Sequence, residues 1–560
     1  MDELEYILII LAALVVLIIR SIYLEKAREK QLLKKIRNAW GNIPEEEYTA
    51  EKLISIAVYY NEHKNIDSDI DDITWNDLDM ENIYMLINNT GSSMGEEYLF
   101  SLLHKLVYEE ETLKERNRII ELFRTNVAIR EKLQLMFHKF GKNMQISLYE
   151  YINRTDDIEI KRPWLHYVCF FGLPISILLI FFLPTLGALL LVFFIVFNII
   201  YYQNEKGNID VYLNVFSYIL NMIHNTKNLS KMELNGLEPY TTELMEHTSK
   251  FKNFARGAGL VLGGRSITSG LADIILDYFR MSLHIDIIKF NSMLKQLRAN
   301  RQSLNRIYEI VGLLDSMVAV ASYREFMKEY TTPILTHTIK PYINTTNLYH
   351  PMIENPVKNN FETTRSALLT GSNASGKSTF LKALAINGIF AQTIYTVLAD
   401  FYHSCYFKIY SSMALHDSIV NNESYYMVEI KSLKRIIDQM NDRTPVLCFV
   451  DEVLRGTNTL ERIAASSQIL QYLTNYPSIC IAATHDIELT HILENYYDNY
   501  HFQEDVIEDD ILFDYKLYTG RAESRNAIKL LGIIGFDQLI IDKAGKEANA
   551  FLETSTWSVL

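Results

Sequence analysis

Gly371-Ser-Asn-Ala-Ser-Gly-Lys-Ser378 is the stretch that decides the fold of this chain of 560 residues. The glycines at its two ends, Gly371 and Gly376, let the backbone curl so that successive N–H groups point at one anion. Lys377 adds a mobile positive charge, and the hydroxyl of Ser378 is placed to ligate Mg²⁺. The octapeptide therefore predicts a loop that holds the phosphates of a nucleotide.

The sequence on either side of the loop supports this interpretation. Residues 366–370 form a short apolar strand candidate, and residues 379–390 have apolar side chains at helical spacing. Phosphates bound by the loop would then lie at a helix N-terminus, where unpaired N–H groups and the helix dipole favour an anion. A chance match in a Gly/Ser loop is the alternative, and the strand before and the helix after disfavour it.

A second element follows at residues 445–452, an apolar run that ends in Asp451 and Glu452. A continuous apolar run predicts a buried strand of a parallel sheet, and acids at its C-terminal end lie where such sheets bind ligands. We expect Asp451 to hold Mg²⁺ and Glu452 to polarise the attacking water, because phosphoryl transfer needs mainly positioning and charge neutralisation. Taken alone, the pattern also fits a strand end that meets solvent.

A third apolar run, residues 478–483, ends in Thr484 and His485. A histidine at this place can reach the γ-phosphate and respond to its presence. A lone histidine has a structural role more often, but its position after the two preceding motifs favours a switch histidine.

With these blocks in view, the chain resembles MutS, a family of ATPases known for DNA mismatch repair and related to ABC-type ATPases. The blocks follow the family order: His350-Pro-Met-Ile353, the loop GSNASGKST at 371–379, the segment 422–429 with Ser424, the segment 451–459 with its Arg-Gly-Thr, and Ala-Thr-His at 483–485. The loop departs from the family pattern GPNxGGKST, since Ser372 replaces the proline and Ala374-Ser375 replace the usual pair.

The resemblance implies an α-helical core domain plus an α/β P-loop ATPase domain of the ABC type, with ATP and Mg²⁺ as cofactors. It implies catalytic roles for Glu452, His485 and Lys377, and Mg²⁺ ligation by Ser378 and Asp451. The implied nucleotide contacts are Gly371, Ser372, Asn373, Ala374, Ser375, Gly376, Lys377, Ser378, Thr379, Ser424 and Asn458.

The resemblance also implies a homodimer with composite sites. Ser424 of one chain would reach the γ-phosphate bound by the other, and Asn458 would lie at the dimer interface. For Ser424 the alternative is an exposed hydroxyl in a polar loop. Two upstream segments, residues 78–130 and 311–324, look like the start and the end of the family's helical core.

Apolar segments separate this chain from the family pattern. Residues 6–19 are uninterrupted and apolar, with acidic residues before them and six basic residues between 26 and 37. With their apolar neighbours they approach the ~20 residues that span a bilayer, and the positive-inside rule places the following chain in the cytoplasm. Because the basic start and cleavage site of a signal peptide are missing, an uncleaved anchor is the better interpretation.

A second apolar stretch, residues 165–202, has no charged residue and is too long for one span. Pro184 interrupts it, which predicts a hairpin of two helices. A buried hairpin of a soluble protein is the alternative, but the basic and aromatic residues at both ends favour a membrane interface. With about three transmembrane helices, we expect a multi-pass membrane protein whose ATPase domain is cytoplasmic.

These observations divide the chain into five parts. They are an N-terminal anchor (1–24), a cytoplasmic helical region with the first part of the core (25–164), the transmembrane hairpin (165–202), the continuation of the core or lever (203–345) and the ATPase domain (346–560).

Charge and composition limit the partners. The net charge of −14 disfavours broad non-specific nucleic-acid binding, which depends on Lys and Arg. The Phe-x-Glu wedge of mismatch-recognition domains is not found before residue 160, and Phe502-Gln-Glu504 carries these letters only after the ATPase strands. We therefore expect the recognition domain to be missing. DNA handling at the membrane, as the family implies, and mechanical work on a protein or lipid partner both stay open.

Overall fold

The computed structural model describes residues 3–142, 147–157, 162–256, 281–372, 375–413, 425–441, 443–507, 510–522, 528, 531, 535–554 and 556–557. The chain forms two compact units. The first, here the helical unit, comprises Met1–His63, Asn88–Ser101 and Ile119–Ser322. The second, here the sheet unit, comprises Lys64–Ile87, Leu102–Arg118 and Tyr323–Leu560.

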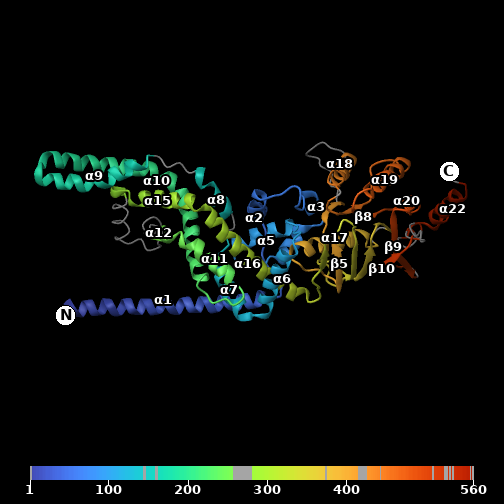
Figure 1. Ribbon diagram of the computed structural model, residues 1–560, viewed down its shortest axis with the longest axis horizontal. Coiled ribbons are helices and arrows are strands. Elements are labelled where there is room, and N and C mark those ends of the chain that lie inside the picture. Colours follow the sequence, from blue (N-terminus) through green and yellow to red (C-terminus); the bar gives the residue numbers. More distant parts are fainter. Residues whose placement is uncertain are drawn as a thin grey trace. The chain divides into compact units, whose positions relative to one another are not determined.

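The described part of the helical unit is built from helices, of which Figure 1 labels all but a short 3-10 helix. They are α1 (Glu3–Ala39), α2 (Ala50–Glu62), α5 (Ser93–His104), α7 (Val127–Phe140), α8 (Leu148–Asn153), a 3-10 helix (Arg154–Asp157), α9 (Pro163–Phe182), α10 (Pro184–Leu229), α11 (Glu238–Ser249), α12 (Lys252–Ala255), α15 (Ile285–Ala299) and α16 (Arg301–Met327). Helix α6 (Glu110–Thr125) contributes residues to both units.

The start and the end of the predicted core meet in this unit. Asp315 on α16 is buried and accepts hydrogen bonds from the backbone N–H groups of Gly91 (3.0 Å) and Ser92 (2.9 Å) and from the Ser92 hydroxyl (2.6 Å). Burial raises the pKa of Asp315 to about 6, although these hydrogen bonds oppose the rise. A single carboxylate thus joins segments that are 223 residues apart.

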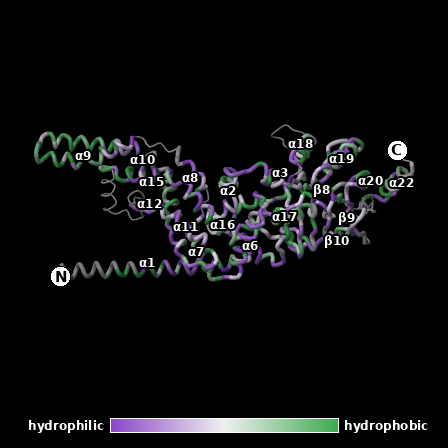
Figure 2. Tube along the Cα trace, in the orientation of Figure 1, coloured by the Kyte–Doolittle hydropathy of each residue, from purple (hydrophilic) through white to green (hydrophobic). Residues whose placement is uncertain are grey.

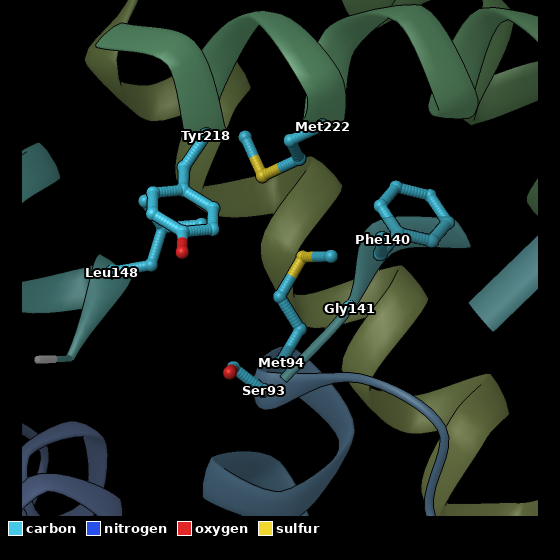
Figure 3. Close-up of a pocket in the computed structure, with 7 residues that line it drawn as sticks. All are labelled: Ser93, Met94, Phe140, Gly141, Leu148, Tyr218 and Met222. Atoms are coloured by element: carbon cyan, nitrogen blue, oxygen red, sulfur yellow. The ribbon is translucent and has the colours of Figure 1, made fainter. Parts of the chain in front are cut away.

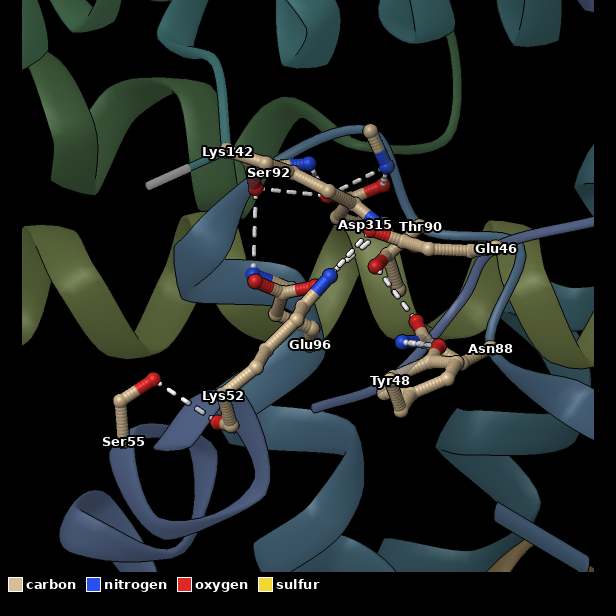
Figure 4. A network of polar contacts seen from close by, with 12 residues as sticks. Glu46, Tyr48, Lys52, Ser55, Asn88, Thr90, Ser92, Glu96, Lys142 and Asp315 are labelled. Carbon is tan, nitrogen blue, oxygen red and sulfur yellow. Dashed lines mark hydrogen bonds and ion pairs between the residues drawn. The ribbon is translucent and has the colours of Figure 1, made fainter. Parts of the chain in front are cut away.

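A buried ionic network lies beside this contact (Figure 4). Lys142 lies 2.6 Å from a carboxylate oxygen of Glu46 and 3.2 Å from one of Glu96, and Lys52 contacts the same two acids. Lys52 and Glu96 are almost fully buried. Because buried charges are tolerated only when they are paired, this network fixes the loops around α2 and α5 to one arrangement.

The predicted hairpin is confirmed as a pair of packed helices, α9 and α10, that break at Leu183-Pro184. They are the long green pair in Figure 2, and Gly172 allows close approach of the Phe194 ring. The second helix is longer than expected. It continues past the apolar stretch to Leu229, because no proline interrupts the polar residues that follow.

Among the described residues, two helical segments are long and apolar enough to cross a membrane, Pro163–Phe182 and Pro184–Gly207. Only 28% of the first and 17% of the second is buried, and Phe181, Phe182 and Leu189 are largely exposed. The predicted anchor at residues 1–24 falls on α1, where Val16 and Ile19 are also exposed. It is not one of the two segments, and it stays a prediction.

A small pocket opens among four helices of the helical unit (Figure 3). Its lining residues are Ser93, Met94, Phe140, Gly141, Leu148, Tyr218 and Met222. None of these side chains is charged.

Two sheets form the centre of the sheet unit. In the described residues the larger sheet has the order β10-β9-β4-β8-β7-β6. Its strands are β4 (Ser366–Thr370), β6 (Lys408–Ser412), β7 (Val446–Asp451), β8 (Ser478–Ala483), β9 (Tyr497–Ile507) and β10 (Asp510–Thr519). All neighbours are parallel except β9 and β10. The predicted buried strand of a parallel sheet is therefore confirmed as β7, and the strands predicted at residues 366–370 and 478–483 are confirmed as β4 and β8.

The smaller sheet has the order β1-β5-β2-β3. Its strands are β1 (Ile334–Thr336), β2 (Ile343–Leu348), β3 (Asn359–Thr363) and β5 (Phe401–Cys405). The helices of this unit are α3 (Asp72–Asp77), α4 (Met80–Ile87), α17 (Lys377–Thr393), α18 (Tyr425–Asp438), α19 (Thr459–Leu473), α20 (Ile487–Ile492) and α22 (Gln538–Thr554). All four cysteines of the chain are free and buried, as expected for reduced thiols.

Helix α17 packs on β6, β7 and β8 and is buried on nearly every side. Its asparagine Asn387 accepts a hydrogen bond from the N–H of Leu398 and donates to the carbonyl of Tyr349. The helix that follows the phosphate loop is therefore held from several directions, which fixes the position of its N-terminus.

Candidate functional site

The predicted phosphate loop lies between the end of β4 and the start of α17 in the sequence. Gly371 has φ 142° and Gly376 has φ 105°, values that side chains with a Cβ rarely adopt. A Cβ on Gly371 would lie 2.7 Å from the Phe502 carbonyl oxygen on β9. Both glycines are therefore required by the local backbone.

Lys377 is the first residue of α17, and its side chain turns back over the loop. The ammonium group donates to the carbonyl oxygens of Gly371 (2.9 Å) and Ser372 (2.7 Å). Burial lowers the pKa of Lys377, while the nearby charges of Asp451 and Glu452 oppose this change. The cation is thus placed inside the loop, where phosphate oxygens would meet it.

Ser378 and Asp451 meet although they are 73 residues apart in the sequence. The Ser378 hydroxyl donates to a carboxylate oxygen of Asp451 at 2.5 Å. Hydroxyl and carboxylate oxygens are ligands that Mg²⁺ prefers, so the donor set fits this ion.

Glu452 follows β7 directly and is held on three sides. Its N–H donates to the Ala483 carbonyl (3.0 Å), and one carboxylate oxygen lies 2.9 Å from Nε2 of His485. The other oxygen pairs with Nε of Arg455. Burial alone would raise the pKa of Glu452. The hydrogen bonds and charges of His485 and Arg455 outweigh this effect and lower the pKa to about 2.

The backbone of Glu452 has φ 58°, and that of Leu454 also has φ 58°. Left-handed backbone at non-glycine residues costs about 1–3 kcal/mol and persists only where the surroundings enforce it. Strain of this kind concentrates at functional sites, and here it directs a charged carboxylate toward the edge of the sheet that carries the phosphate loop.

The other predicted residues differ in what surrounds them. Ser375 is buried within the loop, and Thr379 is exposed in the first turn of α17. Asn458 is the N-cap of α19, and its side chain accepts a hydrogen bond from Glu461 N–H at 3.0 Å. Asn373, Ala374 and Ser424 lie outside the described residues.

Three charged residues near this site were not predicted from the sequence. Glu504 on β9 is 8% exposed and accepts a hydrogen bond from the hydroxyl of Ser372. Arg455 pairs with Glu452, and Glu429 on α18 accepts from the N–H of Arg455. In the sequence, Arg455 and Glu429 lie in segments that resemble the family, but no site role was assigned to them. Glu504 was noted only as part of a Phe-x-Glu pattern that follows the ATPase strands.

Comparison with known proteins places this site in a family context. Residues 367–552 match the family MutS domain V. Human MutS protein homolog 4 is 30% identical over 260 residues, which cover 43% of this chain and 27% of that protein. DNA mismatch repair protein MutS of Pseudothermotoga lettingae is 28% identical over 326 residues, covering 55% of this chain and 40% of the relative.

A third relative gives a similar result. DNA mismatch repair protein MSH3 of Vanderwaltozyma polyspora is 30% identical over 273 residues, 46% of this chain and 26% of its own length. Each match thus spans less than half of the relative concerned. The similarity extends beyond the phosphate loop to the strands β7 and β8 and the residues that follow them.

Proposed function

Because the chain belongs to the MutS family, we propose that it binds ATP with Mg²⁺ at residues 371–379 and hydrolyses it. The observation that carries the proposal is the meeting of Lys377, Ser378, Asp451 and Glu452 at the C-terminal ends of three adjacent parallel strands. Ligands of α/β sheets bind at this edge.

Each group has one task in this proposal. The loop N–H groups and Lys377 bind the β- and γ-phosphates, while Ser378 and Asp451 hold Mg²⁺. The metal, when bound, neutralises charge on the transferred phosphoryl group. Glu452 orients and polarises the attacking water, and His485, hydrogen-bonded to Glu452, responds to the γ-phosphate.

The active assembly we propose is a homodimer. Ser424 of one chain reaches the γ-phosphate held by the other, and Asn458 lies near the interface, as the family pattern implies. Asn458 is the N-cap of α19 and follows Glu452 by six residues in the chain, which keeps it near the proposed site.

We also propose that the chain is anchored in a membrane by residues 1–24 and the α9–α10 hairpin, with the sheet unit in the cytoplasm. Helices of a soluble core are mostly buried, whereas these two are mostly exposed and apolar. ATP binding would close the dimer, and hydrolysis would reopen it and transmit motion to the hairpin.

DNA is the first candidate for the partner, because the relatives named above include DNA mismatch repair proteins. Binding would involve mismatched or branched DNA. A membrane-bound protein or lipid partner without DNA is the second candidate. It is favoured by the net charge of −14 and by the exposed apolar hairpin.

The two candidates are separated by measuring ATP hydrolysis by the full chain in detergent, with homoduplex, mismatched and branched DNA at low and high salt. Stimulation that fades with salt supports DNA handling. Hydrolysis that is indifferent to every DNA supports the membrane partner. Release of the protein from vesicles by alkaline carbonate would contradict the anchor.

A further inference from the structure

The turn that follows strand β7 and Glu452 is held by helix α18, which precedes β7 in the sequence. Residues 453–456 form this turn between β7 and α19. Glu429, on the second turn of α18, accepts a hydrogen bond from the N–H of Arg455 at 3.2 Å. The other carboxylate oxygen of Glu429 is buried and accepts no hydrogen bond from a described residue, and the main chain of Leu454 and Gly456 lowers the pKa of this carboxyl.

Glu429 is only 2% exposed, so its carboxylate is committed to the turn and not to solvent. Burial raises the pKa of Glu429, and the main-chain hydrogen bonds from the turn oppose that rise. A buried carboxylate that accepts the Arg455 N–H holds that peptide plane in one orientation, because an unpaired N–H group buried in the protein is unfavourable.

A second contact ties the same turn to α18. A Cβ on Gly456 would lie 2.9 Å from Cβ of Tyr426, so only glycine permits this approach. Helix α18 is itself anchored through Arg435, which pairs with Asp71 at the N-terminus of α3. The turn therefore rests on a helix that has its own attachment.

Arg455, at the centre of the turn, extends its guanidinium to the carboxylate of Glu452. Together with His485 on the opposite oxygen, it fixes the plane of that carboxylate. Lys377 and Arg462 contribute further positive charge near Glu452 from α17 and α19.

From these contacts we infer that Glu429 and Arg455 are positioning residues, through which α18 sets the orientation of the Glu452 carboxylate. The inference rests on the proposed ATPase activity. It adds a route by which displacement of α18 changes the rate of hydrolysis without altering the phosphate loop.

The test compares the full chain with the variants Arg455→Ala, Arg455→Lys, Glu429→Gln and the double variant Glu429→Gln/Arg455→Ala. Arg443→Ala is the matched control, because Arg443 is exposed just before β7. For each protein kcat, KM for ATP, equilibrium ATP affinity and the melting temperature are measured.

We expect Arg455→Ala to lower kcat by roughly 10–100-fold with KM and ATP affinity within about threefold, since a positioning contact acts on the reacting geometry. Arg455→Lys should recover part of the loss. Glu429→Gln should lower kcat by roughly 3–10-fold. The double variant should equal Arg455→Ala within about twofold, because residues that act through one another are not additive.

Unchanged kcat in Arg455→Ala, or a double variant whose loss is the product of the two single losses, would overturn the inference. A loss that follows the melting temperature in every variant would also overturn it. If the wild-type chain binds ATP but hydrolyses none, the proposed ATPase function is wrong. This result is distinguishable from failure of the present inference, because it is seen without any variant in α18 or the turn.

Discussion

Two carboxylates, Asp315 in the helical unit and Glu452 in the sheet unit, are held in opposite ways. Asp315 is enclosed and accepts neutral N–H and O–H groups, and burial raises its pKa to about 6. Glu452 is partly exposed and lies between His485 and Arg455, which lower its pKa to about 2. The comparison teaches that a carboxylate held by main-chain donors joins segments, whereas one held by cations on a strained backbone stays charged and available for chemistry.

The largest effect is expected from Asp315→Ala. It leaves the N–H groups of Gly91 and Ser92 and the Ser92 hydroxyl without their acceptor, at a cost of about 4 kcal/mol in the free energy of unfolding. Urea denaturation followed by circular dichroism measures it. Glu51→Gln on the exposed face of α2 is the control and should change stability by less than ~0.5 kcal/mol. A loss for Asp315→Ala as small as the control's would show that the core segments are joined by something else.

A pH dependence should accompany Asp315. Its pKa is raised in the folded state, so its contribution to stability is complete below about pH 4 and is lost as pH rises through about 6. Since one pKa unit corresponds to about 1.4 kcal/mol, the wild type should lose up to about 3 kcal/mol relative to Asp315→Asn over this range. Denaturation of both proteins at intervals between pH 4 and pH 7 tests this. A difference that is constant with pH, or that grows in favour of the wild type, would contradict the assignment.

Glu452→Gln tests the other carboxylate of the comparison. Because the lost ion pairs of a partly exposed carboxylate are worth little and the strained backbone is unchanged, the free energy of unfolding should change by less than about 1 kcal/mol. Thermal melting of this variant beside Asp315→Ala measures the difference. If Glu452→Gln proved the more destabilising of the two, Glu452 would be a structural residue.

The smallest effect is expected from Glu504→Gln. This buried carboxylate binds Ser372 of the phosphate loop and places a negative charge near the site of the phosphates. Removing the charge while keeping the shape should tighten ATP binding by roughly threefold, measured by equilibrium titration. Glu362→Gln, an exposed acid on β3, is the control. Weaker ATP binding in Glu504→Gln would mean that the carboxylate organises the loop and does not oppose the phosphates.

Several local elements of both units could be predicted from the sequence, because each is specified by neighbours in the chain. The strands β4, β7 and β8, the helix after the loop and the break at Pro184 follow from apolar runs, glycines and one proline. The full length of α10 could not be predicted, since the end of its apolar stretch is no helix stop.

The contacts that complete the candidate site join residues that are far apart in the sequence. Ser372 and Glu504 are separated by 132 residues, and Glu429 and Arg455 by 26. Such pairs depend on the order of strands in the sheet and on the packing of α18, which no periodicity in the sequence records. The same holds for Ser411 at the end of β6, whose hydroxyl donates to Asp77 on α3 from 334 residues upstream.

The most direct measurement is ATP binding and ATP hydrolysis by wild type and Glu452→Gln, purified side by side as full chains in detergent. We expect equal binding of ATP with Mg²⁺ and a loss of hydrolysis of roughly 100-fold or more in Glu452→Gln, because the group that activates water is removed. Equal rates in the two proteins would show that Glu452 does not activate the water. Absence of ATP binding in both would contradict the assignment of residues 371–379 as the nucleotide site.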